Sequence, residues 1–212
     1  MYPPKKHQDD NCNHMIEVIK TYPLATVISV KDNQPLITHL PLIYEDQKLI
    51  GHIDIYNPQA KLIKDNSDVT ILFSGPECYI SPSIYSTTQL PTWNYIKVHL
   101  KGKVKVIESK AALKQSLITM TEFLEAPDHK YVLESDNPRL DKNLDYIEMF
   151  EIEITDWEGK FKLSQDKKPK DIEAARNELV RVNQESIRKF LDKVFKTTGN
   201  FIPTITTNSL KP

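Results

Sequence analysis

Apolar and polar residues alternate along much of the chain, which is the pattern of half-buried β-strands. Three such segments follow one another: LATVISV at 24–30, LITHLPLIY at 36–44 and KLIGHIDI at 48–55. The turn-like sequences KDNQP and EDQ separate them, so we expect an antiparallel meander. Two further strands are predicted at 68–75 and 77–81.

The most regular alternation lies at residues 93–106, where apolar side chains point one way and basic side chains the other. The basic set, which we call the basic ridge, comprises Lys97, His99, Lys101, Lys103 and Lys105. Lysine commonly guards an exposed sheet face, so a solvated surface is the ordinary interpretation. The alternative is a surface that contacts the phosphates of DNA or of a cofactor.

Helical periodicity appears in four segments: 11–21, 58–64, 109–125 and 171–195. Asn57 caps the second segment and Pro58 begins it, while Ser109 can cap the third. A last pair of strands is expected within 149–164, with a turn around residues 156–159.

The order of these elements predicts a mainly β protein with flanking helices, of the α+β class, built on a closed antiparallel barrel. Regular alternation of strands and helices, which a doubly wound sheet requires, is missing from the pattern. We expect a barrel domain at 1–166, a helical extension at 167–198 that packs on the barrel, and a flexible tail at 199–212.

Composition narrows the function classes. The 212 residues carry a net charge of −1, so no overall field attracts nucleic acid. No apolar run approaches a membrane span and no signal peptide is visible, which makes a cytoplasmic location the expectation. The 5 glycines are too dispersed for a dinucleotide or phosphate-binding loop, and the 2 cysteines form no zinc motif.

The sequence NPQAK at 57–61 is a candidate phosphate site. The first turn of a helix has unpaired N–H groups, so we expect donors at Gln59 and Ala60, with the Gln59 amide and the Lys61 ammonium beside them. The plainer alternative is that Asn57 merely caps a surface helix.

Two other groups of residues are candidates. His39 and His52 lie on adjacent predicted strands, but no carboxylate or cysteine completes a recognisable ligand spacing, so we predict no metal site and expect hydrogen-bonding roles. In PTWNY, Trp93 offers a flat apolar surface and Asn94 an amide, which suits a planar polar ring as well as an ordinary turn.

Taken together, MYPP, ATVIS, THLP, GHIDIYNPQ, GPECYISPSIY, PTWNY and EIEITDWEGKFKLSQ resemble the PaiB family of FMN-binding negative transcriptional regulators. That family is related to split-barrel flavoproteins such as pyridoxamine phosphate oxidase. The similarity spans residues 1–165, and the combination of PTWNY with EGKFKLSQ is its most specific part.

The resemblance implies a split β-barrel with Greek-key-like connections, assembled as a homodimer with two FMN sites at the subunit boundary. It implies phosphate contacts for Asn57, Gln59 and Lys61, and a place near the flavin for Trp93 and Asn94. The residues expected beneath the isoalloxazine or at its polar edge are Thr38, His39, Leu40 and His52. For Ser81, Tyr85, Lys162, Ser164 and Gln165, flavin contact and dimer packing both stay open.

Two classes of function follow from the resemblance. One is a negative transcriptional regulator that acts on DNA directly or through a protein partner. The other is a flavin-dependent oxidoreductase, for which no catalytic residue is predicted. Haem binding through His39, His52 or His99 is a weaker alternative. The related oxidase holds its phosphate with arginines, and Lys61 alone predicts modest FMN affinity.

Overall fold

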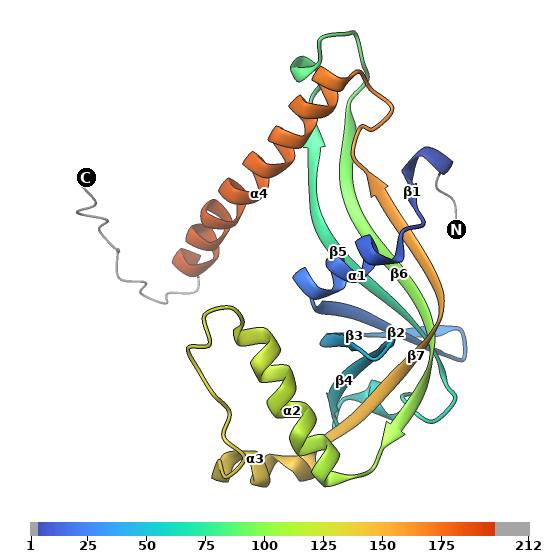
Figure 1. Ribbon diagram of the computed structural model, residues 1–212, viewed down its shortest axis with the longest axis vertical. Helices are drawn as coiled ribbons and strands as arrows, with labels where there is room; N and C mark the ends of the chain where they lie inside the picture. The colour runs from blue at the N-terminus through green and yellow to red at the C-terminus, as the bar shows by residue number, and fades with distance from the viewer. Residues whose placement is uncertain (1–3, 198–212) are drawn as a thin grey trace, which may run out of the picture. The chain divides into compact units, whose positions relative to one another are not determined.

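The structure, a computed structural model, describes residues 4–197 (Figure 1). These residues form two compact units, 4–75 with 95–162 and 76–94 with 163–197, which we call the barrel unit and the second unit. The expected tail at 199–212 lies outside the described residues. The expected domain boundary after residue 166 stays a prediction.

One seven-stranded sheet dominates the described part of the chain, with strand order β1-β7-β4-β3-β2-β5-β6. Strand β7 also pairs with β6, so the sheet closes on itself and the predicted antiparallel barrel is confirmed. The strands are β1 (Gln8–Asp9), β2 (Leu24–Lys31), β3 (Gln34–Glu45), β4 (Lys48–Asp54), β5 (Asp68–Ile80), β6 (Thr92–Ile107) and β7 (Ile147–Lys162).

The predicted meander corresponds to β2, β3 and β4, which lie side by side in Figure 1. Two-residue loops join them, Asp32–Asn33 and Asp46–Gln47, and all four residues have positive φ. This backbone conformation gives tight hairpin turns that match the twist of the strands, and Asn and Asp tolerate it better than most residues. Turn chemistry therefore sets the register of this part of the barrel.

The expected turn around 156–159 is wrong, because β7 is one continuous strand from Ile147 to Lys162. Gly159 is needed for a close approach and not for a turn. A Cβ at this position would lie 2.4 Å from the backbone oxygen of Asp9 in β1. Residues 68–81 likewise contain one strand, β5, where two were expected.

The helices are α1 (Cys12–Thr21), α2 (Lys110–Glu125), α3 (Pro138–Asn143) and α4 (Pro169–Thr197), with 3₁₀ turns η1 (Lys5–His7), η2 (Pro58–Lys61), η3 (Pro82–Ile84) and η4 (Leu144–Tyr146). The predicted caps are confirmed, since Asn57 accepts from Gln59 N and Ser109 from Ala112 N. The segment expected to be helical at 58–64 is only the short turn η2. Among the described residues, no helix combines the length and apolar character needed to span a membrane.

Each unit has its own hydrophobic core. The inward faces of the barrel strands meet the buried face of α1, and Phe73, Phe150, Met15 and Ile19 are among the largest fully buried side chains there. In the second unit, Cys78 and Ile80 from the end of β5 pack with Ala175 and Leu179 of α4. Burial of apolar surface therefore stabilises both units.

Candidate functional site

Asn57 joins two elements of the barrel unit at the predicted phosphate corner. Its side-chain oxygen accepts a hydrogen bond from Gln59 N at 2.9 Å, and its Nδ2 donates to Thr38 Oγ1 at 3.1 Å. Thr38 is half-buried on β3, opposite Val27 of β2, so its side chain lies on the inner face of the sheet. The amide therefore fixes η2 against the barrel.

The free backbone donors expected at the start of η2 are not found, and this prediction is wrong. Gln59 N is used by the Asn57 side chain, and Ala60 N donates to Asn57 O at 2.9 Å. A four-residue 3₁₀ turn satisfies these groups within itself, which a longer α-helix could not do. The structure thus favours the plainer alternative, in which Asn57 acts as a cap.

Gln59 is turned into the barrel and is only 1% exposed. Its Nε2 donates to Val27 O and to Ser29 Oγ, both at 3.1 Å. Because Val27 O can only accept, the amide orientation is determined, and Gln59 Oε1 is left buried without a hydrogen-bond partner. This side chain joins η2 to β2 and does not lie on the surface as expected for a phosphate ligand.

Lys61 is exposed at the end of η2. In the described part of the chain its ammonium takes part in no hydrogen bond or ion pair. It is thus a free cation on the same short turn that Asn57 attaches to Thr38. Of the three predicted phosphate contacts, Asn57 and Lys61 are accessible and Gln59 is not.

Neighbouring residues on β3 point to opposite faces of the sheet. Thr38 faces inward, whereas His39 is exposed and its Nδ1 lies 3.0 Å from Thr26 Oγ1. Leu40 packs against the barrel core. The side chains of Thr38 and His39 therefore cannot both contact one face of a ligand, although the backbone of the strand is common to both.

His52 lies on the outer face of β4, between the buried core residues Gly51 and Ile53. Its Nε2 is 3.0 Å from Ser116 Oγ of α2. Burial lowers the pKa of His52 to about 4, so the ring is neutral at pH 7. Ser116 was missed by sequence reasoning, although its spacing from Leu113 and Met120 places this polar residue on the apolar face of α2.

The histidines considered as haem or metal ligands have separate surroundings. His52 is bound to Ser116, His39 to Thr26, and burial lowers the pKa of His99 on β6. Among the described residues, no group of three or more His, Cys, Asp and Glu side chains is arranged to hold a metal ion.

Three of the motifs in the second unit meet in one hydrogen-bonded chain. Asn94 of PTWNY is 1% exposed and its Oδ1 accepts from Ser164 Oγ at 3.1 Å. The Ser164 oxygen in turn lies 2.8 Å from Tyr85 OH, so the tyrosine is the donor in that pair. These contacts give Asn94, Ser164 and Tyr85 a structural role that their distances in sequence did not show.

Trp93 precedes Asn94 on β6, so its side chain points to the opposite face of the strand from Asn94, and it is 53% exposed. Its ring meets Tyr79 edge-on, with the centroids 6.5 Å apart. Asp171, buried in the same unit, accepts from Ser86 N at 2.7 Å and from Thr87 Oγ1 at 3.3 Å. The hydrogen bond from Ser86 N is the largest of the effects that lower the pKa of Asp171. Sequence reasoning missed this carboxylate.

Most of the basic ridge of β6 lies opposite acidic residues of β7, whereas Lys97 lies opposite Lys160. The antiparallel register places His99 opposite Glu158, Lys101 opposite Asp156 and Lys105 opposite Glu151. Lys101 pairs with Asp156 at 3.0 Å, and Lys103 with Asp68 of β5 at 2.7 Å. This arrangement, which we call the charge ladder, supports a solvated sheet face and not a phosphate-binding surface.

Comparison with known proteins places these features in a family. The sequence profile described as "Putative FMN-binding domain" matches residues 1–156. "Protease synthase and sporulation protein PAI 2" of Bacillus subtilis (strain 168) is 30% identical over 187 residues, which cover 84% of this chain and 90% of that protein.

Solved structures share the fold. The FAD and heme binding protein from Mycobacterium smegmatis has a TM-score of 0.62 at 19% identity, covering 79% of this chain and 80% of its own. The flavocytochrome Anf3 from Azotobacter vinelandii has a TM-score of 0.59 at 15% identity, covering 73% and 69%. At these identities the likeness concerns the split-barrel fold alone. The family profile covers most of this chain, and the match with PAI 2 covers 84% of this chain and 90% of PAI 2. This chain therefore belongs to the PaiB-like family of FMN-binding domains, whose cofactor is FMN.

Proposed function

We propose that this chain binds FMN with the phosphate at the corner formed by Thr38, Asn57 and Lys61. The observation that carries the proposal is the free ammonium of Lys61 on a turn that Asn57 ties to β3. A phosphate needs a cation and hydrogen-bond donors. Thr38 Oγ1 accepts from Asn57 Nδ2 at 3.1 Å and donates to Asn57 Oδ1 across a long 3.5 Å contact, so rotation of this hydroxyl would present its O–H to a phosphate oxygen.

The residues of this corner fit the cofactor, with a limit on affinity. Lys61 offers a point charge, whereas an arginine would offer two parallel N–H groups to the phosphate. FMN affinity is therefore modest. When bound, FMN supplies redox chemistry through its isoalloxazine ring, and the protein supplies binding and orientation. Contacts of Trp93, Asn94, His39, Leu40 and His52 with the ring stay predictions.

A titration of FMN against riboflavin isolates the phosphate contact. Replacing Lys61 with Gln should weaken FMN binding about three- to tenfold and leave riboflavin affinity unchanged, because riboflavin has no phosphate. Lys61→Arg should restore or improve FMN affinity. Lys20→Gln, which removes an exposed lysine from α1, is the matched control. Flavin fluorescence measures each affinity, and an equal loss for both flavins would refute the assigned corner.

We infer a homodimer from the outer face of β2 and β3. Leu24, Val30 and Ile37 are 63%, 65% and 56% exposed on these adjacent strands. Ile28 pairs with Ile37 on the same face. Large apolar residues gathered on one sheet face support burial against another protein surface, and a second copy of this chain is the partner that the family resemblance implies.

The biological role that we propose is regulation. The name of PAI 2 refers to protease synthesis and sporulation, which are controlled cellular processes. From this name we transfer to this chain only a role in regulation. In the charge ladder, most basic residues of β6 lie opposite acidic residues of β7. These acidic residues oppose contact with DNA phosphates, which favours action through a protein partner. A shift of a promoter fragment at physiological salt, absent with random DNA, would instead support direct binding.

A flavin-dependent oxidoreductase is the second candidate. It is favoured by family membership, since hydride transfer requires orientation of the flavin and no dedicated basic side chain. Anaerobic addition of NADH or NADPH to the FMN-loaded protein tests it, and bleaching of the flavin band, reversed when oxygen is admitted as the electron acceptor, is the expected result for an enzyme. A flavin that stays oxidised with both nucleotides would support the regulatory role.

A further inference from the structure

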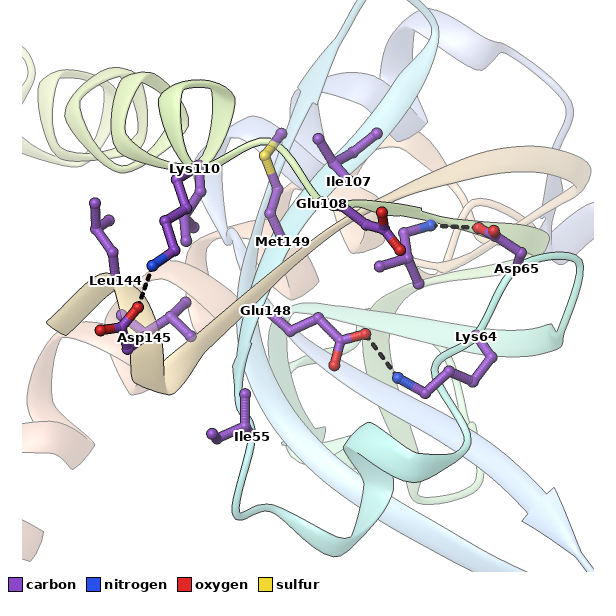
Figure 2. A pocket seen from close by; sticks show the side chains of 13 residues that line it. Ile55, Lys64, Asp65, Ile107, Glu108, Lys110, Leu144, Asp145, Glu148 and Met149 are labelled. Atoms are coloured by element: carbon purple, nitrogen blue, oxygen red, sulfur yellow. Dashed lines mark hydrogen bonds and ion pairs between the residues drawn. The ribbon is translucent and has the colours of Figure 1, made fainter.

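A cavity of about 400 Å³ lies within the barrel unit (Figure 2). Thr38, Asn57 and Lys61 are not among the residues that line it. Its walls come from Ile55 just after β4, the segment after η2, the end of β6 with Glu108, the first turn of α2, η4 and the start of β7. Small-molecule sites have volumes of roughly 300–1,000 Å³. The cavity is therefore large enough for a small ligand.

The floor of this cavity is apolar and its mouth is charged. Leu113 and Met149 are buried at its base, and Ile55 is exposed at its rim. Two lysines and four carboxylates also line it, so the formal charge of the lining is −2. An anion is disfavoured in such surroundings.

Most of these charges already have partners. Lys64 Nζ lies 2.8 Å from Glu148 Oε1, and Lys110 forms an ion pair with Asp145. Asp65 accepts a hydrogen bond from Val106 N at 2.7 Å. Within the described part of the chain, Glu108 has no hydrogen bond or ion pair. Among the described residues of the lining, Asp65 and Glu108 are thus left without a cation, and of these two Glu108 also has no hydrogen bond.

Glu108 is exposed and directly follows the last residue of β6. That last residue, Ile107, is paired with Met149, the neighbour of Glu148 in β7. Figure 2 shows both carboxylates directed into the same space. Like charges that share one space repel each other, and Lys64 compensates only Glu148.

We propose that this cavity binds a small organic ammonium ion, with its charge at Glu108 and its hydrocarbon portion on the floor formed by Leu113 and Met149. A divalent metal fits less well, because Ca²⁺ and Mg²⁺ require several oxygen ligands and, among the described residues, no three carboxylates are arranged to hold a metal ion. The proposal is independent of the assignment of the FMN corner and adds a second ligand site to the barrel unit.

Titration of the full chain with n-pentylammonium, followed by two-dimensional NMR or calorimetry, tests the proposal. We expect chemical-shift changes around Ile55, Leu113 and Met149. Methylammonium should bind more weakly, since each buried methylene contributes up to about fourfold in affinity. Pentanoate, which has the same chain and the opposite charge, should not bind.

Glu108→Gln should weaken pentylammonium binding about fivefold, the effect expected for one partly exposed ion pair. Glu122→Gln, which removes an exposed carboxylate of α2 outside the cavity, should have no effect. Thermal melts of both variants verify that they fold. Unchanged binding by Glu108→Gln, equal binding of pentanoate, or displacement by millimolar Mg²⁺ would overturn the proposal. The titrations are done without FMN, so their outcome does not depend on the flavin assignment.

Discussion

Burial converts Gln59 from an expected ligand contact into a structural residue. Its amide bridges Val27 O and Ser29 Oγ inside the barrel. We expect Gln59→Met, which has a similar shape, to lower the free energy of unfolding by about 1–3 kcal/mol, because the Val27 carbonyl loses its donor. Urea denaturation measures this effect. Gln115→Met on the exposed side of α2 should change stability by less than about 0.5 kcal/mol. If Gln59→Met impaired only FMN binding, the structural role would be wrong.

His52 makes stability depend on pH in a defined window. Its pKa is about 4 in the folded protein, against 6.5 for an unperturbed histidine, because burial disfavours the charged ring. Above pH 6.5 both states are neutral. As the pH falls from 6.5 to 4, the unfolded state binds a proton that the folded state does not, so stability decreases by up to about 3 kcal/mol.

The substitution His52→Gln should remove this contribution while keeping a hydrogen-bonding group near Ser116. We expect the difference in unfolding free energy between wild type and variant to shrink steadily from pH 6.5 to 4, measured by urea denaturation. Gln115→Met, which removes no titratable group, should show a constant difference. Parallel curves for His52→Gln and wild type would show that His52 is not the titrating group.

Residue-level predictions from the sequence succeeded where the relevant contact is local. Asn57 and Ser109 cap the elements that follow them, and each bond spans two or three residues. The hydrogen bonds of Asn94 with Ser164 and of Ser164 with Tyr85 span 70 and 79 residues. Sequence separation on this scale leaves no periodic signal, so the pattern of residues could not show that these three side chains meet.

At the scale of elements, a substitution at Gly159 distinguishes two explanations for a glycine in β7: a turn, or the close approach of β1. A Cβ there would lie 2.4 Å from Asp9 O, so β1 would have to move. We expect Gly159→Ala to lower the free energy of unfolding by about 2 kcal/mol or more and to accelerate hydrogen exchange at Gln8 and Asp9. At Gly75 the nearest atom is the Ile96 Cβ at 3.1 Å, so Gly75→Ala should cost less. Equal effects of the two substitutions would contradict the close-approach explanation.

The same glycine shows the limit of reading elements from sequence. Alternation of apolar and polar residues located every long strand of the barrel, since each has one face in the core. It could not distinguish a turn from a glycine that admits a neighbouring strand, because both interrupt the pattern at one residue. The break at Gly75–Pro76 was misread in the same way, and β5 continues through it.

At the scale of the whole molecule, charge placement matters more than net charge. The net charge of −1 arises from 28 basic and 29 acidic residues, and on β6 and β7 the two signs face each other across the strands. A row of lysines in the sequence therefore does not produce a basic surface along its whole length, and only at Lys97 does a second basic residue, Lys160, lie opposite. The acidic partners come from a strand about 50 residues away, which alternation in β6 alone could not indicate.

The exposed apolar face of β2 and β3 gives a prediction for assembly. We expect a mass of two chains in light scattering, and a shift toward one chain for Ile37→Lys, because a buried unpaired charge opposes association. Leu124→Lys, at a similarly exposed position of α2, should leave the mass unchanged. A monomeric wild type would refute this interface. If the flavin site also requires both subunits, Ile37→Lys should lose FMN together with its partner, whereas Lys61→Gln should lose FMN affinity and stay dimeric. The two variants therefore separate a defect in assembly from a defect in the phosphate contact.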